Sequence, residues 1–153
     1  MLKFFKNKSV GYYLACAAAV LALVFIVVFY TTLGVPGTEN TSMPNSAVSK
    51  TAETIGIFMI GGFVVELAVL LVPEFAFVQL VALVLFGLSF YKEIICCPQV
   101  LAAIVTGVAY EGGSLPAHLT YIILEIAIFV LAIVSCFLGL TKKTEEGTKE
   151  SET

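Results

Sequence analysis

Arginine, aspartate and tryptophan are absent from this sequence, and histidine occurs once. Without arginine, the chain lacks the planar guanidinium group that binds phosphate and carboxylate through two parallel hydrogen bonds. Its eight cationic residues are all lysine, and eleven acidic residues bring the net charge to −3 at pH 7. A nucleic-acid-binding domain needs a basic patch or stripe, which such a chain does not supply. We therefore expect no nucleic-acid partner.

Charge of either sign is scarce. Charged residues make up 12% of the 153 positions and hydrophobic residues 59%, whereas soluble domains average roughly 25% charged residues. A small globule has too much surface per unit volume to hide so large an apolar share inside. The composition therefore predicts an all-α integral membrane protein whose main partner is the lipid bilayer.

Cysteines are few and their spacing is uninformative. Cys16, Cys96, Cys97 and Cys136 include no CxxC pair, so they form neither a zinc motif nor a disulfide framework. The adjacent pair Cys96-Cys97 could act as a redox pair, but adjacent cysteines close only a strained ring. No nucleophile–base pair, phosphate-binding loop or metal cluster appears elsewhere. We expect no enzyme activity and no cofactor.

Long apolar runs give the expected membrane spans, because about 20 apolar residues cross a hydrocarbon core of roughly 30 Å. The run from Thr54 to Phe90 is too long for one span, and Pro73 is its only plausible break because proline removes an amide donor. A cleaved signal peptide is the alternative reading of the first run, but that run is longer than a signal's apolar segment. The predicted spans are residues 12–33, 54–72, 75–91 and 119–140.

Residues 94–110 are ambiguous. This segment contains Pro98 and could be a fifth span, or an extension of the third span followed by an interfacial or re-entrant helix. Lysine placement favours four spans, because most lysines lie at the two ends of the chain and the positive-inside rule then puts both termini in the cytoplasm. These lysines are Lys3, Lys6, Lys8, Lys142, Lys143 and Lys149.

The predicted fold is thus a single membrane domain over residues 1–140. It is a four-transmembrane-helix bundle with an extra interfacial or re-entrant helix at 99–110, between spans three and four. Residues 141–153 are expected to form a disordered cytoplasmic tail. The predicted location is the cell membrane, with several passes and both termini cytoplasmic.

Polar residues inside the predicted spans are the candidate site. Glu66, Gln79 and Glu125 fall within apolar runs, where an ionised side chain costs on the order of 2.5–3.5 kcal/mol on insertion scales. Glu66 lies seven residues before Pro73 and Gln79 six after it, so an antiparallel hairpin brings them to similar depth. We expect a hydrogen bond between them, and expect Ser89, Tyr91 or Thr54 near Glu125. These residues form either a proton or cation site or simple interhelical contacts.

Two stretches carry a resemblance to a known group of proteins. LKFFKNKSVGYYLACAAAVLALV near the start and LAAIVTGVAYEGG from residue 101 resemble small, uncharacterised four-span membrane proteins of Gram-positive bacteria. The resemblance implies four spans and no particular activity. Small multidrug transporters share the size and a membrane glutamate, but their essential glutamate lies in the first span, which has no carboxylate here.

Two functions remain open from the sequence. The first is a non-enzymatic membrane protein that acts as an accessory or structural subunit, alone, as a homo-oligomer or within a membrane complex. The second is a small proton- or cation-coupled transporter that uses Glu66.

Overall fold

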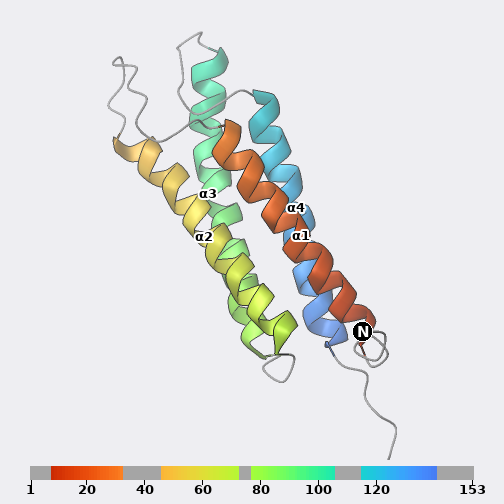
Figure 1. Cartoon of the computed structure of the whole chain (residues 1–153). Coiled ribbons are helices and arrows are strands. Elements are labelled where there is room, and N and C mark those ends of the chain that lie inside the picture. The colour runs from red at the N-terminus through yellow and green to blue at the C-terminus, as the bar shows by residue number, and fades with distance from the viewer. Residues whose placement is uncertain (1–7, 33–45, 73–76, 106–114, 141–153) are drawn as a thin grey trace, which may run out of the picture.

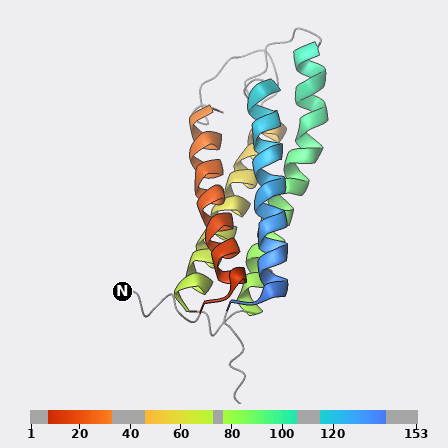
Figure 2. The same ribbon diagram turned by 90° about the vertical axis from the view of Figure 1, so that its right-hand side faces the viewer.

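The computed structural model describes residues 8–32, 46–72, 77–105 and 115–140, and this part of the chain is all-helical. Its four helices are α1 (Val10–Thr32), α2 (Ser46–Leu71), α3 (Gln79–Val105) and α4 (Leu115–Leu138). Each helix packs against two neighbours, in the pairs α1·α4, α2·α3, α3·α4 and α1·α2. The result is an antiparallel bundle in which consecutive helices alternate in direction (Figures 1 and 2).

The start of α1 and the end of α4 are joined at one end of the bundle. The Ser9 amide donates to the Leu140 carbonyl over 3.3 Å, and the Ser9 hydroxyl donates to the Gly139 carbonyl. Ser9 also caps α1, since its hydroxyl accepts from the Tyr12 amide. Gly139 follows the last residue of α4 at φ 64°, the left-handed conformation that often ends a helix. The start of α1 and the end of α4 therefore lie at the same end of the bundle.

Three of the helices are long and apolar enough to cross a membrane. They are Val10–Thr32, Glu53–Leu71 and His118–Leu138. Large apolar side chains also cover the outward faces, with Phe137 86% exposed and Phe77 71% exposed. Such a surface suits a hydrocarbon solvent and would aggregate in water. The composition-based prediction of an all-α chain with membrane character is confirmed.

The predicted spans 54–72 and 119–140 agree to within two residues with the candidate spans Glu53–Leu71 and His118–Leu138, but the helices that contain them begin earlier. Helix α2 begins at Ser46, eight residues before the predicted span, because a helix satisfies its own backbone hydrogen bonds whether its side chains are polar or apolar. Helix α4 begins at Leu115, four residues before the predicted span, since Pro116 is tolerated in a first turn, where its missing amide has no acceptor to lose. The break predicted at Pro73 agrees with the end of α2 at Leu71, although Pro73 itself lies outside the described residues.

The largest correction concerns α3. One helix continues from Gln79 to Val105. The prediction that span three ends at Tyr91 is therefore wrong. The prediction of a separate helix at 99–110 is also wrong for its residues up to 105. The polar residues after Tyr91 do not interrupt it, since Glu93 is buried and pairs with His118 of α4. A fifth span would need a reversal there, so that alternative is also wrong. At 27 residues and 1.5 Å per residue, α3 is about 40 Å long, and it extends past its neighbours in Figure 2.

Residues 106–110 and the predicted tail at 141–153 lie outside the described residues. The same holds for the side chains of Cys96 and Cys97. Cys16 and Cys136 are free and half-buried.

Small residues let the helices approach closely. Ala15, Ala18, Ala19 and Ala22 form a fully buried stripe on α1, as expected for helix contacts in lipid, where van der Waals packing replaces the hydrophobic effect. Gly11 lies so close to α4 that an added Cβ would overlap the Gly139 carbonyl and stand 3.0 Å from the Ser135 carbonyl oxygen. Backbone contact thus fixes the α1–α4 distance at this end.

Candidate functional site

Buried polar side chains gather in two clusters inside the bundle. We call Glu66, Gln79 and Ser135 the Glu66 cluster, and Ser89, Glu93, His118 and Glu125 the Glu125 cluster. All seven side chains are buried, with relative exposures of 4% or less. In lipid, such groups find partners on neighbouring helices because no water is available to them.

The Glu66 cluster joins α2, α3 and α4 through the amide of Gln79. The Gln79 Nε2 group donates to Glu66 Oε1 over 3.0 Å and to Ser135 Oγ over 2.5 Å. The Ser135 hydroxyl donates in turn to the Ala132 carbonyl, 3.0 Å away. The predicted Glu66–Gln79 hydrogen bond is therefore present, and Ser135 is a third member that we did not expect.

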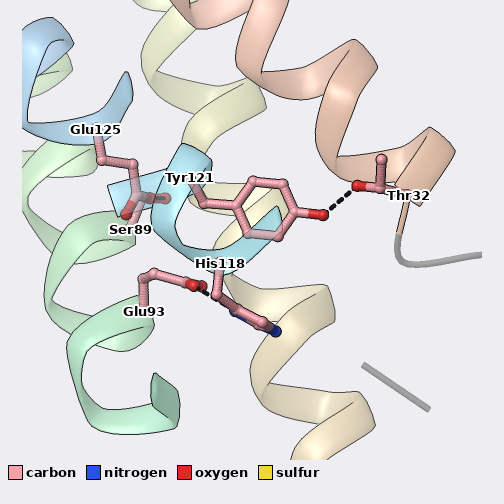
Figure 3. Close-up of polar contacts among 6 residues, drawn as sticks. All are labelled: Thr32, Ser89, Glu93, His118, Tyr121 and Glu125. Carbon is pink, nitrogen blue, oxygen red and sulfur yellow. Dashed lines mark hydrogen bonds and ion pairs between the residues drawn. The ribbon is translucent and has the colours of Figure 1, made fainter. Parts of the chain in front are cut away.

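The Glu125 cluster begins with Ser89 of α3. Its hydroxyl oxygen lies 2.7 Å from Glu125 Oε1 and 3.2 Å from the Ile55 carbonyl oxygen of α2. Of the three partners expected for Glu125, Ser89 is in hydrogen-bond contact with it. Figure 3 shows the Glu125 carboxyl group lying beside Ser89.

One turn further along α3, Glu93 meets the single histidine of the chain. Its Oε1 lies 2.8 Å from His118 Nδ1, and the side chains are 1% and 4% exposed. The His118 ring also stands edge-on to Tyr121, with centroids 5.4 Å apart. The Tyr121 hydroxyl bonds to Thr32 at the end of α1. These contacts, visible in Figure 3, tie three helices together at the end of the bundle opposite to Ser9.

An apolar layer separates the two clusters. Ser89 follows Gln79 by ten residues on α3, and Ser135 follows Glu125 by ten on α4, which is about 15 Å of helix in both cases. The side chains between them form one buried core, in which the Phe25 and Phe29 rings stack at 5.4 Å. This core includes Ala22, Phe25, Phe29, Ile55, Met59, Ala82, Phe86, Ile128 and Ala132.

Sequence reasoning missed the Glu93–His118 pair. Neither Glu93 nor His118 was among the predicted site residues, and the third span was predicted to end at Tyr91. A signal was available, because Gln79, Ala82, Phe86, Ser89 and Glu93 recur at intervals of three and four residues, which places them on one helix face. Extending the stripe by one turn would have turned Glu93 toward the bundle interior.

The chemistry of these groups is that of proton donors and acceptors. Among the described residues, no group of three or more His, Cys, Asp or Glu side chains is arranged to hold a metal ion. Within the same residues, two buried carboxyl oxygens have no hydrogen-bond partner, Glu66 Oε2 and Glu125 Oε2. Glu66 and Glu125 thus each use one oxygen for an interhelical contact and leave the other unpaired.

Comparison with known protein families, curated proteins and solved structures finds no match to this chain.

Proposed function

We propose that the protein is a non-enzymatic, multi-pass protein of the cell membrane that serves as an accessory or structural subunit. The observation that carries this proposal is that the buried polar groups bond to one another across helix interfaces. Gln79 joins three helices, Ser89 joins three and His118 joins two. Interhelical hydrogen bonds of this kind hold membrane helices together and fix their rotation.

Four crossings with both termini in the cytoplasm fit this arrangement best. Helix α3 packs between α2 and α4, so it crosses with them, although Lys92 and Glu93 interrupt its apolar sequence. Burial of Glu93 against His118 removes one of these charges from contact with lipid. An even number of crossings also agrees with α1 beginning where α4 ends.

Cysteine labelling tests this topology. In a variant without the four native cysteines, we expect Glu53→Cys to react with a membrane-impermeant maleimide added outside intact cells. Val72→Cys should react only after the cells are opened, because these exposed residues flank the two ends of the Glu53–Leu71 span. Labelling of both from the same side would contradict the proposed crossing of α2.

The subunit role predicts a stable assembly and no transport. Extracted from native membranes in mild detergent, the protein should migrate with a larger mass than the purified single chain. Reconstituted alone in liposomes with a pH-sensitive dye inside, it should pass neither protons nor metal cations. Migration as a single chain in native extracts would count against the accessory role.

A second candidate function is proton- or cation-coupled transport through Glu66. The unpaired Glu66 Oε2 favours it, because a carboxyl oxygen without a partner can accept a proton or a cation. The matched experiment compares wild type with Glu66→Gln, which keeps the shape and the acceptor for Gln79. A flux in wild type that this substitution abolishes would establish transport and overturn the purely structural role of Glu66.

A further inference from the structure

The hydrogen bonds around Ser89 bear on the protonation state of Glu125. The Ser89 oxygen lies within hydrogen-bond distance of two acceptors, Glu125 Oε1 at 2.7 Å and the Ile55 carbonyl at 3.2 Å. A hydroxyl group has one hydrogen to donate, whereas a carbonyl has none. With Ser89 as the donor in both contacts, its single hydrogen is shared in a weaker three-centre bond, whereas two full bonds form if Glu125 donates its own proton to Ser89 Oγ while Ser89 donates to Ile55. Glu125 completes this arrangement as a neutral carboxylic acid.

The Glu66 cluster needs no such proton. The Gln79 amide nitrogen has two hydrogens, one for Glu66 Oε1 and one for Ser135 Oγ. Ser135 then uses its own hydrogen for the Ala132 carbonyl. Each of these three bonds forms with Glu66 as an acceptor alone, although Glu66 Oε2 has no partner, so the hydrogen bonds distinguish Glu66 from Glu125.

A second observation points to a small ligand at Glu125. Its side chain is 1% exposed and its Oε2 atom has no partner. Metal cations such as Ca²⁺ require six or more oxygen ligands, and the contacts of Glu125 provide far fewer. A single proton, which needs one donor oxygen and one acceptor, fits the site.

We infer that Glu125 is a proton-binding site, loaded at neutral pH, that exchanges its proton with the Glu93–His118 pair at the adjacent end of the bundle. When Glu125 releases its proton, Ser89 turns its hydroxyl hydrogen from Ile55 to the new Glu125 carboxylate. The imidazole of His118 takes up the proton and becomes an imidazolium beside the Glu93 carboxylate. The inference is independent of transport, because it concerns proton binding from one side.

The surroundings support this direction of exchange. Glu93 follows Ser89 by one turn of α3 and therefore lies on the same helix face as the residue that contacts Glu125. On the other side, the apolar core with Phe86 and Ile128 lies between Glu125 and the Glu66 cluster, so it blocks proton movement further along the bundle. The titratable side chains on the neighbouring turns are Tyr30 on α1, Glu53 on α2, Lys92 and Glu93 on α3, and His118 and Tyr121 on α4.

Infrared spectroscopy of the whole protein in liposomes tests the inference, because a protonated carboxyl group has a C=O stretching band that a carboxylate lacks. At neutral pH we expect this band in wild type and in the matched control Glu66→Gln. It should be lost in Glu125→Gln. Absence of the band in wild type, or its persistence in Glu125→Gln, would overturn the inference.

Two further variants test the partners of Glu125. Ser89→Ala should shift the band, since the protonated Glu125 loses its hydrogen-bond acceptor. If Glu125→Gln does not fold, this variant tests whether the band belongs to Glu125. His118→Asn should keep the band but slow its deuterium exchange several-fold. An unshifted band in folded Ser89→Ala would refute the hydrogen count, and unchanged exchange in His118→Asn would refute the exchange route. Loss of the band on adding Na⁺, K⁺ or Ca²⁺ at constant pH would overturn the inference, because it would show that the site binds a metal cation in place of the proton.

Discussion

Gly62→Ala is expected to destabilise the bundle by about 1–3 kcal/mol, the usual cost of forcing extra volume into a packed core. An added Cβ at Gly62 would stand 2.6 Å from two atoms of the Phe86 ring. Phe86 is 1% exposed and belongs to the apolar layer between the two polar clusters, so its ring has no free space to enter. The measurement is the midpoint of thermal unfolding in detergent micelles.

The preceding residue provides the control. Gly61 lies on the same helix, but a Cβ there meets only a methyl group of Leu85 at 3.5 Å, an ordinary contact. Both substitutions bring the same gain in helix propensity, so the difference between them isolates the overlap with Phe86. Gly61→Ala should leave stability unchanged or slightly raised. Equal midpoints for the two variants would mean that α2 and α3 are not packed as described.

Gln79→Leu is expected to cost about 1–2 kcal/mol, because it leaves Glu66 buried without a partner. The double variant Glu66→Leu/Gln79→Leu should recover most of this loss, since replacing both partners with apolar groups leaves no orphaned polar atom. Ser135 does not offset the recovery, because its hydroxyl still donates to the Ala132 carbonyl. Unfolding free energies of the wild type, both single variants and the double variant form the required cycle.

The sign of the coupling is the decisive result of this cycle. If the hydrogen bond between Gln79 Nε2 and Glu66 Oε1 contributes to stability, the double variant must be more stable than Gln79→Leu alone. Additive losses would show that the two residues act independently. A double variant as stable as wild type would indicate that Glu66 is kept for a reason other than stability, which would favour the transport candidate.

Glu66 and Glu125 are both buried, but their hydrogen bonds suggest different roles. The Glu66 carboxyl group accepts a hydrogen bond from Gln79, whereas we infer that Glu125 supplies a proton to Ser89. Because the apolar layer separates them, a structural Glu66 and a proton-binding Glu125 can exist in the same bundle. The flux and infrared experiments therefore address separate properties, and failure of one leaves the other standing.

The sequence by itself determined that the chain has membrane character and approximately where its helices lie. Scarce charge and long apolar runs are properties of the chain that need no knowledge of its neighbours, and α1 at Val10–Thr32 lies within two residues of the predicted span. The Glu66–Gln79 contact was also predictable, because a short connection at Pro73 fixes the relative depth of two consecutive helices. Spacing along the sequence is sufficient to predict a contact when the two partners lie on consecutive helices, close to the connection between them.

Only the tertiary structure decided the rest. Glu93 and His118 are 25 residues apart, and their contact depends on how α3 and α4 are rotated and how far α3 continues past Tyr91. The sequence did not predict that α3 continues past Tyr91, because it does not distinguish a charged residue that ends a span from one that faces a partner inside the bundle. Rotation and depth of a membrane helix are set by packing against its neighbours, so the choice of Ser89 for Glu125, and the proton that we infer from this choice, emerge only once the four helices are assembled.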